Sequence, residues 1–303
     1  MKKDSKYQGT VVPMVTPFTA DGRLDEPSLD RLVDSLLAGG VDGIFVMGTT
    51  GEGVTIPEAD RRRIVARTVA RANGAVKIFA GISNGHSDET GMGNDYLRDG
   101  ADALVLHPRA GMDPAEMLPW FRKILDRLNG PLLLYNMPMT TKVSIPLDTV
   151  EKLLGHPRLA GIKDSEKDPE RLKELLENFG GKKDFSVFVG VGALMEKGLK
   201  LGADGIVPSV GNLIPQVCHQ LCEAAKSGDW EKANTHFSRM SAVAELYQNG
   251  RTLNDSLSAL KAAMHCRGLC APHVLPPLQP LPPAQLEKLH AEMERLHLLN
   301  GKS

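Results

Sequence analysis

The chain has no excess of either charge: 36 lysines and arginines are balanced by 37 aspartates and glutamates, for a formal net charge of -1. Without a basic surplus, the sequence gives no indication of binding to nucleic acid or to an anionic membrane. It also lacks an apolar run near the roughly 18 residues of a membrane span, and its polar start lacks the apolar core of a signal peptide. We therefore expect a cytoplasmic protein that acts on a small molecule.

Cysteine is scarce as well, with only four residues. They form two pairs at a spacing of four, each beside a histidine: Cys218 and Cys222 with His219, Cys266 and Cys270 with His265. This spacing puts two thiols on one helix face, which would suit a metal ion, but it is not the two-residue gap of common zinc knuckles. We expect buried thiols in helices of a reducing compartment, and no metal.

The remaining composition is that of an ordinary globular protein, with 303 residues of which 42% are hydrophobic and 24% are charged. Length alone would suit two domains. Barrels of alternating strands and helices, however, routinely use about 200 to 250 residues as one domain.

Short apolar strands alternate with helical patterns along the first two thirds of the chain. The predicted strands are Thr10–Thr16, Ile44–Met47, Lys77–Ala80, Ala103–Leu106, Leu132–Tyr135, Leu159–Lys163, Ser186–Val189 and Gly205–Val207. The predicted helices between them begin at Asp25 and then span Pro57–Ala72, Asp88–Arg98, Pro114–Leu128, Pro146–Leu154, Pro169–Asn178 and Ala193–Leu201. Such alternation indicates parallel strands with crossover helices, and eight units close into a (β/α)8 TIM barrel.

The chain stays helical after the last strand, and we expect additional C-terminal helices. Their predicted ranges are Pro215–Lys226, Trp230–Tyr247, Leu253–Cys266 and Pro283–Leu299, with a proline-rich extended connector at Leu275–Pro283. The predicted organisation is thus a barrel catalytic domain over residues 1–212 and a helical region over 213–303, packed on the barrel or used in assembly.

One predicted strand, Leu159–Lys163, ends in a lysine. Burial disfavours an ammonium group and lowers the pKa of a lysine toward neutrality, and a free amine can form a Schiff base with a ketone. A lysine that ends a strand in solvent is the other interpretation of this residue taken alone.

Two more strand ends carry candidate chemistry. Gly48-Thr49-Thr50-Gly51-Glu52 offers hydroxyls and backbone amides that could hold a carboxylate, or it is an ordinary glycine turn. Tyr135-Asn136-Met137-Pro138 offers a phenol that could relay protons, or that only satisfies a hydrogen bond. Loops after barrel strands meet at one rim, where a 2-oxo acid would need the carboxylate pocket, the phenol and the lysine together.

These two motifs and Gly161-Ile162-Lys163-Asp164, in this order, resemble the dihydrodipicolinate synthase / N-acetylneuraminate lyase family over about Gly9 to Leu299. The resemblance implies a (β/α)8 barrel with C-terminal helices, a homo-oligomer (dimer or tetramer), and a Schiff base with pyruvate or a larger 2-oxo acid without a further cofactor. It implies that Lys163 forms the Schiff base, Tyr135 relays protons, Thr49 and Thr50 in the loop begun by Gly48 hold the carboxylate, and Val207 lies near the bound pyruvate.

Departures from the family pattern bear on the substrate. Dihydrodipicolinate synthases carry an arginine where this chain has Thr140, and a threonine cannot supply a bidentate clamp. The loop His107–Gly111 lacks the family's second tyrosine; His107 or Arg109 could replace it as proton carrier or distal carboxylate ligand, or the loop is plain surface. Gly190–Ala193 lacks the acidic residues of sialic-acid lyases.

We therefore expect a class I lyase acting on pyruvate or a 2-oxo acid, most simply a 2-oxo-3-deoxy sugar acid aldolase or dehydratase. Asp164, Ser165, Thr140 and Thr141 would suit a hydroxylated tail. Two alternatives are dihydrodipicolinate synthase proper, which joins pyruvate and aspartate semialdehyde, and a non-catalytic metabolite-binding barrel.

Overall fold

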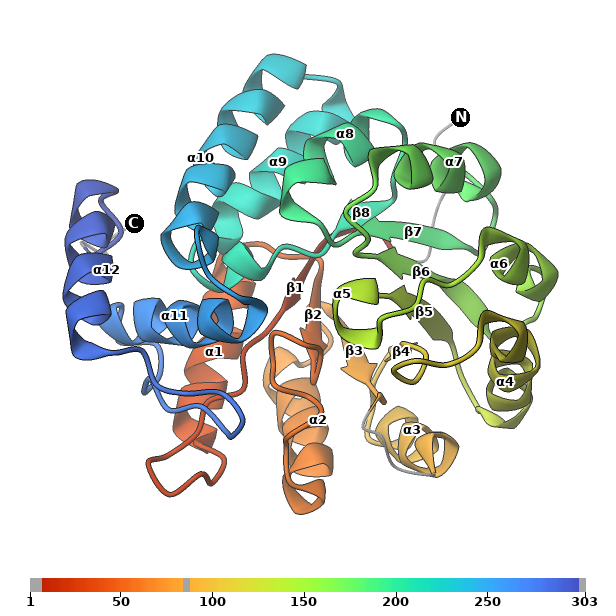
Figure 1. The fold of residues 1–303 in the computed structure, drawn as a ribbon, viewed down its shortest axis with the longest axis horizontal. Helices are drawn as coiled ribbons and strands as arrows, with labels where there is room; N and C mark the ends of the chain where they lie inside the picture. The colour runs from red at the N-terminus through yellow and green to blue at the C-terminus, as the bar shows by residue number, and fades with distance from the viewer. Residues whose placement is uncertain (1–6, 84–87, 300–303) are drawn as a thin grey trace.

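Eight parallel strands close into a barrel in a computed structural model that describes residues 7–83 and 88–299 (Figure 1). Each strand pairs with its neighbour in sequence, and the circle closes where β1 pairs with β8 at Thr10 and Ile206. The strands are β1 (Gly9–Pro13), β2 (Gly43–Val46), β3 (Lys77–Gly81), β4 (Ala103–Leu106), β5 (Leu132–Asn136), β6 (Leu159–Asp164), β7 (Ser186–Val189) and β8 (Gly205–Ile206). The predicted TIM barrel is confirmed.

Helices surround the barrel and continue after its last strand. They are α1 (Glu26–Ala38), α2 (Glu58–Ala72), α3 (Glu89–Arg98), α4 (Pro114–Arg127), α5 (Pro138–Thr141), α6 (Leu147–Leu153), α7 (Pro169–Phe179), α8 (Met195–Lys200), α9 (Pro215–Ser227), α10 (Trp230–Gln248), α11 (Leu253–Cys266) and α12 (Pro283–Arg295), with 3-10 turns η1 (Gly192–Leu194) and η2 (Ser209–Asn212). None of the described helices is long and apolar enough to cross a membrane.

The element bounds differ from the predicted ones in three places with a visible cause. The first strand ends at Pro13 because the amide of Val15 donates to the Asn212 side chain (3.0 Å) instead of to a neighbouring strand. The last helix ends at Arg295 because His297 takes a left-handed conformation. The four-residue helix α5, with Pro138 at its first position, is too short to leave a periodic pattern.

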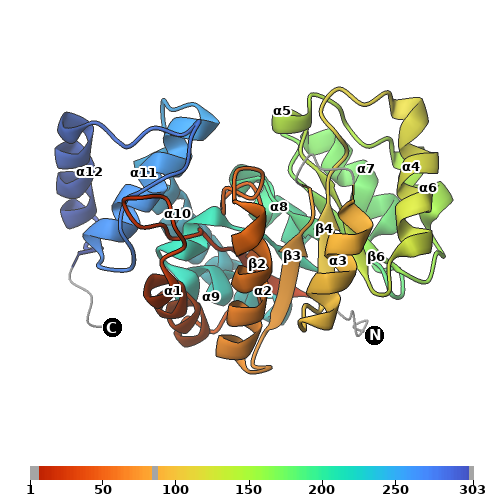
Figure 2. The ribbon, with the colours of Figure 1, turned by 90° about the horizontal axis from the view of Figure 1, so that it is seen from below.

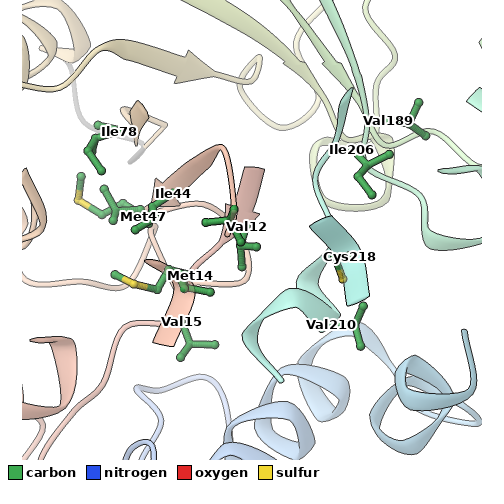
Figure 3. Close-up of a cluster of buried hydrophobic side chains, with 14 of the residues drawn as sticks. Val12, Met14, Val15, Ile44, Met47, Ile78, Val189, Ile206, Val210 and Cys218 are labelled. Atoms are coloured by element: carbon green, nitrogen blue, oxygen red, sulfur yellow. The ribbon is translucent and has the colours of Figure 1, made fainter. Parts of the chain in front are cut away.

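Alternate residues of each strand face two different cores. Phe45 lies in the cluster inside the barrel, whereas its neighbours Ile44 and Val46 lie in the cluster between barrel and helices. Figure 3 shows part of this outer cluster, where Val12, Ile44 and Ile206 from three strands meet residues of the loops and of α9.

Three short repeats in the sequence, Gly-Val-Asp-Gly and two of Gly-Ala-Asp, share one structural role. Asp42, Asp102 and Asp204 each precede a strand, and each carboxylate accepts a backbone N–H of the preceding strand, from Thr10 (2.8 Å), Ile78 (2.9 Å) and Val187 (2.8 Å). The carboxylate satisfies an amide at the strand start that the ladder leaves unpaired. The repeats therefore set strand register.

Helix α9 follows β8 and packs on β1, where the Thr10 hydroxyl donates to the Cys218 carbonyl (3.1 Å). It is thus the eighth outer helix of the barrel, and the division proposed at residue 212 falls between the last strand and the helix that covers it. Helices α10, α11 and α12 extend from there, and α11 and α12 lie beside the barrel next to α1 (Figure 2).

All four cysteines are free thiols. Cys218 and Cys222 are buried in α9 and Cys266 ends α11 half-buried, but Cys270 lies beyond the helix, so the expectation of four helical thiols is wrong for this residue. Within residues 7–83 and 88–299, no three metal-ligating side chains converge.

Candidate active site

Lys163 lies inside the mouth of the barrel and is not in solvent. It is the fifth residue of β6, directly opposite Tyr135 of β5, and in-register residues of parallel strands point to the same face. Only 6% of Lys163 is exposed, and its Nζ lies 3.8 Å from the centre of the Tyr135 ring and 5.0 Å from that of Phe45. The amine is therefore held over two aromatic faces.

Space for this lysine comes from Gly190, which follows β7. A Cβ at Gly190 would overlap the Ser165 hydroxyl and lie 3.1 Å from Cε of Lys163. Only a glycine lets the loop after β7 approach the lysine stem this closely. The glycine that begins the acid-free run Gly190–Ala193 thus has a steric role beside Lys163.

Thr49 lies at the hydroxyl end of Tyr135, with the two hydroxyl oxygens 3.3 Å apart. Thr49 and Thr50 belong to a tight turn in which the amides of Gly51 and Gly53 both donate to the Gly48 carbonyl (3.0 Å each). A Cβ at Gly53 would overlap the Met47 carbonyl, so the turn requires a glycine there. The turn presents the threonine side chains to the barrel mouth.

Glu52 in the same turn forms a buried ion pair with Lys261 of α11, which sequence reasoning missed. The two side chains are 2% and 1% exposed; Glu52 also accepts the Leu275 amide (2.7 Å), and Lys261 donates to the His273 carbonyl (2.8 Å). Burial lowers the pKa of Lys261, and Glu52 opposes that shift. A single charge inside the apolar run Ala259–Met264 was the available signal.

Asp164 follows Lys163 but points out of the barrel. Its carboxylate accepts hydrogen bonds from Asn136 Nδ2 (2.9 Å), Arg171 Nε (3.0 Å) and the Glu166 amide (2.9 Å). Burial raises the pKa of Asp164, with Arg171 opposing. The expectation that Asp164 would bind a hydroxylated tail is wrong, because this side chain holds β5, β6 and α7 together.

A cavity of about 460 Å³ opens at the barrel mouth, within the usual range for small-molecule sites. Five of the predicted site residues line it: Lys163, Tyr135, Thr49, Thr50 and Val207. Ser165 lines it as well. The structure thus brings together the three catalytic candidates and two of the predicted binding residues.

A second cavity of about 300 Å³ adjoins the first and shares Thr49, Tyr135 and Leu253 as its wall. Gly48 and Thr140 line this second cavity, away from the Lys163 amine. The Thr140 hydroxyl donates to the Met137 carbonyl (3.1 Å), and the buried Thr141 hydroxyl bonds the Val143 carbonyl (2.8 Å). Both threonine hydroxyls therefore serve the α5 turn.

His107 lies in the second cavity, with its ring edge-on to Tyr135 at 5.9 Å between centroids. Its Nδ1 lies 2.8 Å from the Pro108 carbonyl oxygen, so Nδ1 carries the hydrogen and Nε2 the lone pair. Burial lowers the pKa of His107; the Pro108 hydrogen bond opposes this and the nearby Lys163 reinforces it. The imidazole is therefore neutral near pH 7.

Arg109 is exposed and lines neither of these two cavities. Its guanidinium lies 3.4 Å from the Glu89 carboxylate and 5.8 Å from the centre of the Trp120 ring. Within this chain, the structure does not bring the predicted ligand Arg109 to the site.

The fold and its mouth define an α/β-barrel enzyme with a buried amine beside a phenol and a threonine-bearing turn. The Dihydrodipicolinate synthetase family model matches residues 6–296, so the chain belongs to this family and is a lyase. It is 34% identical over 273 residues to the 4-hydroxy-tetrahydrodipicolinate synthase of Methanothermobacter thermautotrophicus, covering 88% of this chain and 95% of that one.

Two further relatives carry the names of two different activities. The Escherichia coli protein named "Putative 2-dehydro-3-deoxy-D-gluconate aldolase YagE" is 28% identical over 303 residues, covering 98% of this chain and all of that one. The solved dihydrodipicolinate synthase of Bacteroides thetaiotaomicron superposes with a TM-score of 0.90 at 29% identity, covering 97% of this chain and 100% of that one. The solved YagE structure, in complex with pyruvate, has a TM-score of 0.88.

Proposed function

We propose that the protein is a Schiff-base-forming class I lyase that acts on pyruvate or a larger 2-oxo acid. The observation that carries this proposal is the Lys163 amine, buried against the Tyr135 ring and open to a cavity that Thr49 and Thr50 also line. The pyruvate complex of the similar protein YagE supports the same substrate class.

In the proposed reaction, Nζ of Lys163 attacks the keto carbon and water leaves, which forms an iminium. The iminium withdraws electrons from the adjacent carbon, so that a C–C bond breaks or forms, or a β-hydroxyl leaves. Thr49 and Thr50 orient the acid through its carboxylate, and Tyr135 moves the proton. The iminium is the electron sink, so the scheme calls on no further cofactor.

His107 is our candidate for the proton carrier that replaces the family's second tyrosine. It packs edge-on against Tyr135, and the bond from Nδ1 to Pro108 leaves the lone pair of Nε2 to accept a proton. A neutral imidazole near pH 7 can take a proton from the phenol of Tyr135 and return it.

For the second substrate we favour a 2-oxo-3-deoxy sugar acid, cleaved by an aldolase or dehydrated. Thr140 lines the neighbouring cavity and lacks the charge to clamp the carboxylate of aspartate semialdehyde. The names of the synthase relatives favour dihydrodipicolinate synthase proper as the second candidate. A screen of 2-oxo-3-deoxy acids, scored for pyruvate released against water lost, separates aldolase from dehydratase, and condensation with aspartate semialdehyde tests the synthase.

Borohydride trapping tests the chemistry itself. Wild type incubated with pyruvate and borohydride should gain the mass of one reduced adduct, and a Lys163→Ala variant should gain none. Equal adducts in both, or none in wild type, would refute the proposal. A non-catalytic barrel would instead keep its stabilisation by pyruvate undiminished in Lys163→Ala and turn over no 2-oxo acid.

A homo-oligomer, dimer or tetramer, is part of the same proposal. Its test is the mass of the native protein in solution by sedimentation equilibrium. A monomer over the whole concentration range would contradict it.

A further inference from the structure

The large cavity at the barrel mouth is lined by three basic side chains and by no acid among the described residues. Lys163, Lys167 and Arg251 line it, together with the hydroxyl-bearing residues Ser165 and Ser256 and others, and no aspartate or glutamate takes part. The proposed function uses one of these basic side chains, Lys163, for the Schiff base. The other two have no role in that scheme.

Arg251 lies in the short connection between α10 and α11, after Gly250, which has a left-handed φ of +68°. One of its donors is used locally: Nη1 donates to the Leu246 carbonyl near the end of α10 (3.0 Å). Its Nε–H is buried and has no hydrogen-bond partner among the described residues. A buried donor without an acceptor is unusual in a native protein, and here it belongs to a side chain that lines the cavity.

The guanidinium is suited to an anion because it is planar and presents its donors as a fixed fork to a carboxylate or a phosphate. The bond to Leu246 holds this fork in place before any ligand arrives. Lys167, exposed on the loop after β6, adds a second positive charge on the same cavity. Lys167 and Arg251 belong to segments other than the Thr49–Thr50 turn, and both line the same cavity as that turn.

We infer that Arg251, assisted by Lys167, binds a second anionic group at the far end of the 2-oxo acid. The inference rests on the proposed function, which assigns the first carboxylate to Thr49 and Thr50 and the keto carbon to Lys163. The substrate class is a 2-oxo acid with a terminal carboxylate or phosphate. Recognition of the far end thus falls to the α10–α11 connection, and not to position 140, where this chain has a threonine.

The test uses three probes with one carbon skeleton: 2-oxo-3-deoxygluconate, its 6-phosphate, and 2-oxo-3-deoxyglucarate. These end in a neutral hydroxyl, a phosphate and a carboxylate. Borohydride trapping gives the half-saturating concentration of each probe on the intact protein, whether or not turnover follows. Wild type should trap at least one anionic probe at a concentration about tenfold or more below the neutral one, as a charged hydrogen bond provides. A preference for phosphate or for carboxylate identifies which anion is bound.

Arg251→Gln should remove the preference, Arg251→Lys should retain part of it, and added salt should weaken it. Arg122→Gln is the matched control, because Arg122 also donates to one backbone carbonyl, that of Lys152 (3.2 Å), but lines neither cavity; it should keep the full preference. If Arg251→Gln does not fold, the exposed Lys167→Gln serves, with a partial loss expected.

Two results separate the possible failures. If pyruvate gives an adduct but wild type traps the neutral and anionic probes equally, or if Arg251→Gln weakens all three alike, this inference is overturned and the proposed function stands. If neither pyruvate nor any probe is trapped, the proposed function is overturned and the inference is overturned with it.

Discussion

The buried pair of Glu52 and Lys261 joins the turn that carries Thr49 to the C-terminal helices, and its removal is the sharpest test of the structure. Lys261→Met keeps the length of the side chain and its packing on the Phe18 ring, which lies 4.6 Å from Nζ, but it leaves the Glu52 carboxylate buried without a counter-ion. Such a charge costs about 3–5 kcal/mol of unfolding free energy.

The expected loss is large enough to measure in a thermal melt. On the scaling for chains of roughly 150–250 residues, about 3–5 kcal/mol lowers Tm by roughly 6–20 °C, with this longer chain toward the lower end. Glu52→Gln combined with Lys261→Met should recover a clear part of the loss, because the glutamine oxygen still accepts the Leu275 amide without a buried charge. The melt is read by circular dichroism at fixed protein concentration.

The matched control is Lys152→Met. Lys152 also pairs with a carboxylate, Asp148 at 2.7 Å, but these side chains are 56% and 62% exposed, so the change should leave Tm unaltered. If the Tm of Lys261→Met lies within about 2 °C of that of wild type, then breaking the pair does not leave a costly buried charge on Glu52, and the reasoning is refuted. Equal losses in the single and double variants would refute the specific role of the Glu52 charge.

Three further predictions concern the site and the thiols. Gly190→Ala should slow adduct formation on Lys163 about tenfold or more, since it crowds the lysine stem, whereas Gly192→Ala, with open space at its Cβ, should not; equal rates would contradict this. Burial keeps the pKa of His107 low in the folded state, so the stability due to its neutral form is present above about pH 6.5 and is lost as pH falls. His107→Gln should therefore reduce the loss of stability in acid and remove the acid limb of the kcat profile. An unchanged kcat profile would count against the proton-carrier role. A thiol reagent should label only Cys266 in the native protein and all four cysteines in denaturant, since the other three are buried; rapid native labelling of more than one would be inconsistent.

Much of this fold could be predicted from the sequence because the barrel repeats one local pattern. The β-branched and leucine runs, the glycine after each helix and the aspartate before a strand recur along the chain, and each repeat specifies a strand start. The elements that could not be predicted have no such pattern: α5 is only four residues long, and β1 ends early because of Asn212, which lies 197 residues from Val15. A side chain so distant in sequence leaves no local signal.

The candidate site also contains residues that could be predicted from the sequence and residues that could not. Lys163 and Tyr135 come together because β5 and β6 are sequential strands in register, which the order of the motifs implies. Side chains alternate along a strand, so the residue after an inward-pointing lysine must point outward. The sequence alone could therefore have shown that Asp164 does not reach the substrate side of the barrel. The partners of Arg251 and Lys261 could not be predicted. The lone charge in the apolar run Ala259–Met264 marks Lys261 as unusual, but the packing that brings it to Glu52, and Arg251 to the cavity, is set by tertiary contacts.

Because α11 packs on the barrel mouth, the candidate site includes residues that follow the barrel in the sequence. Arg251 and Leu253 line the cavity that holds Lys163, and Lys261 neutralises the turn that carries Thr49. The segments after the barrel therefore line the candidate site, add the charge of Arg251 to it and hold the Thr49 turn, whereas the proposed reactive amine comes from β6. The strands fix where the amine and the phenol stand, since their register is set by backbone hydrogen bonds. The shape and charge of the space in front of them depend on α11 and the connection before it. If the proposed function holds, a substitution there should change which 2-oxo acid is preferred and leave adduct formation on Lys163 unchanged.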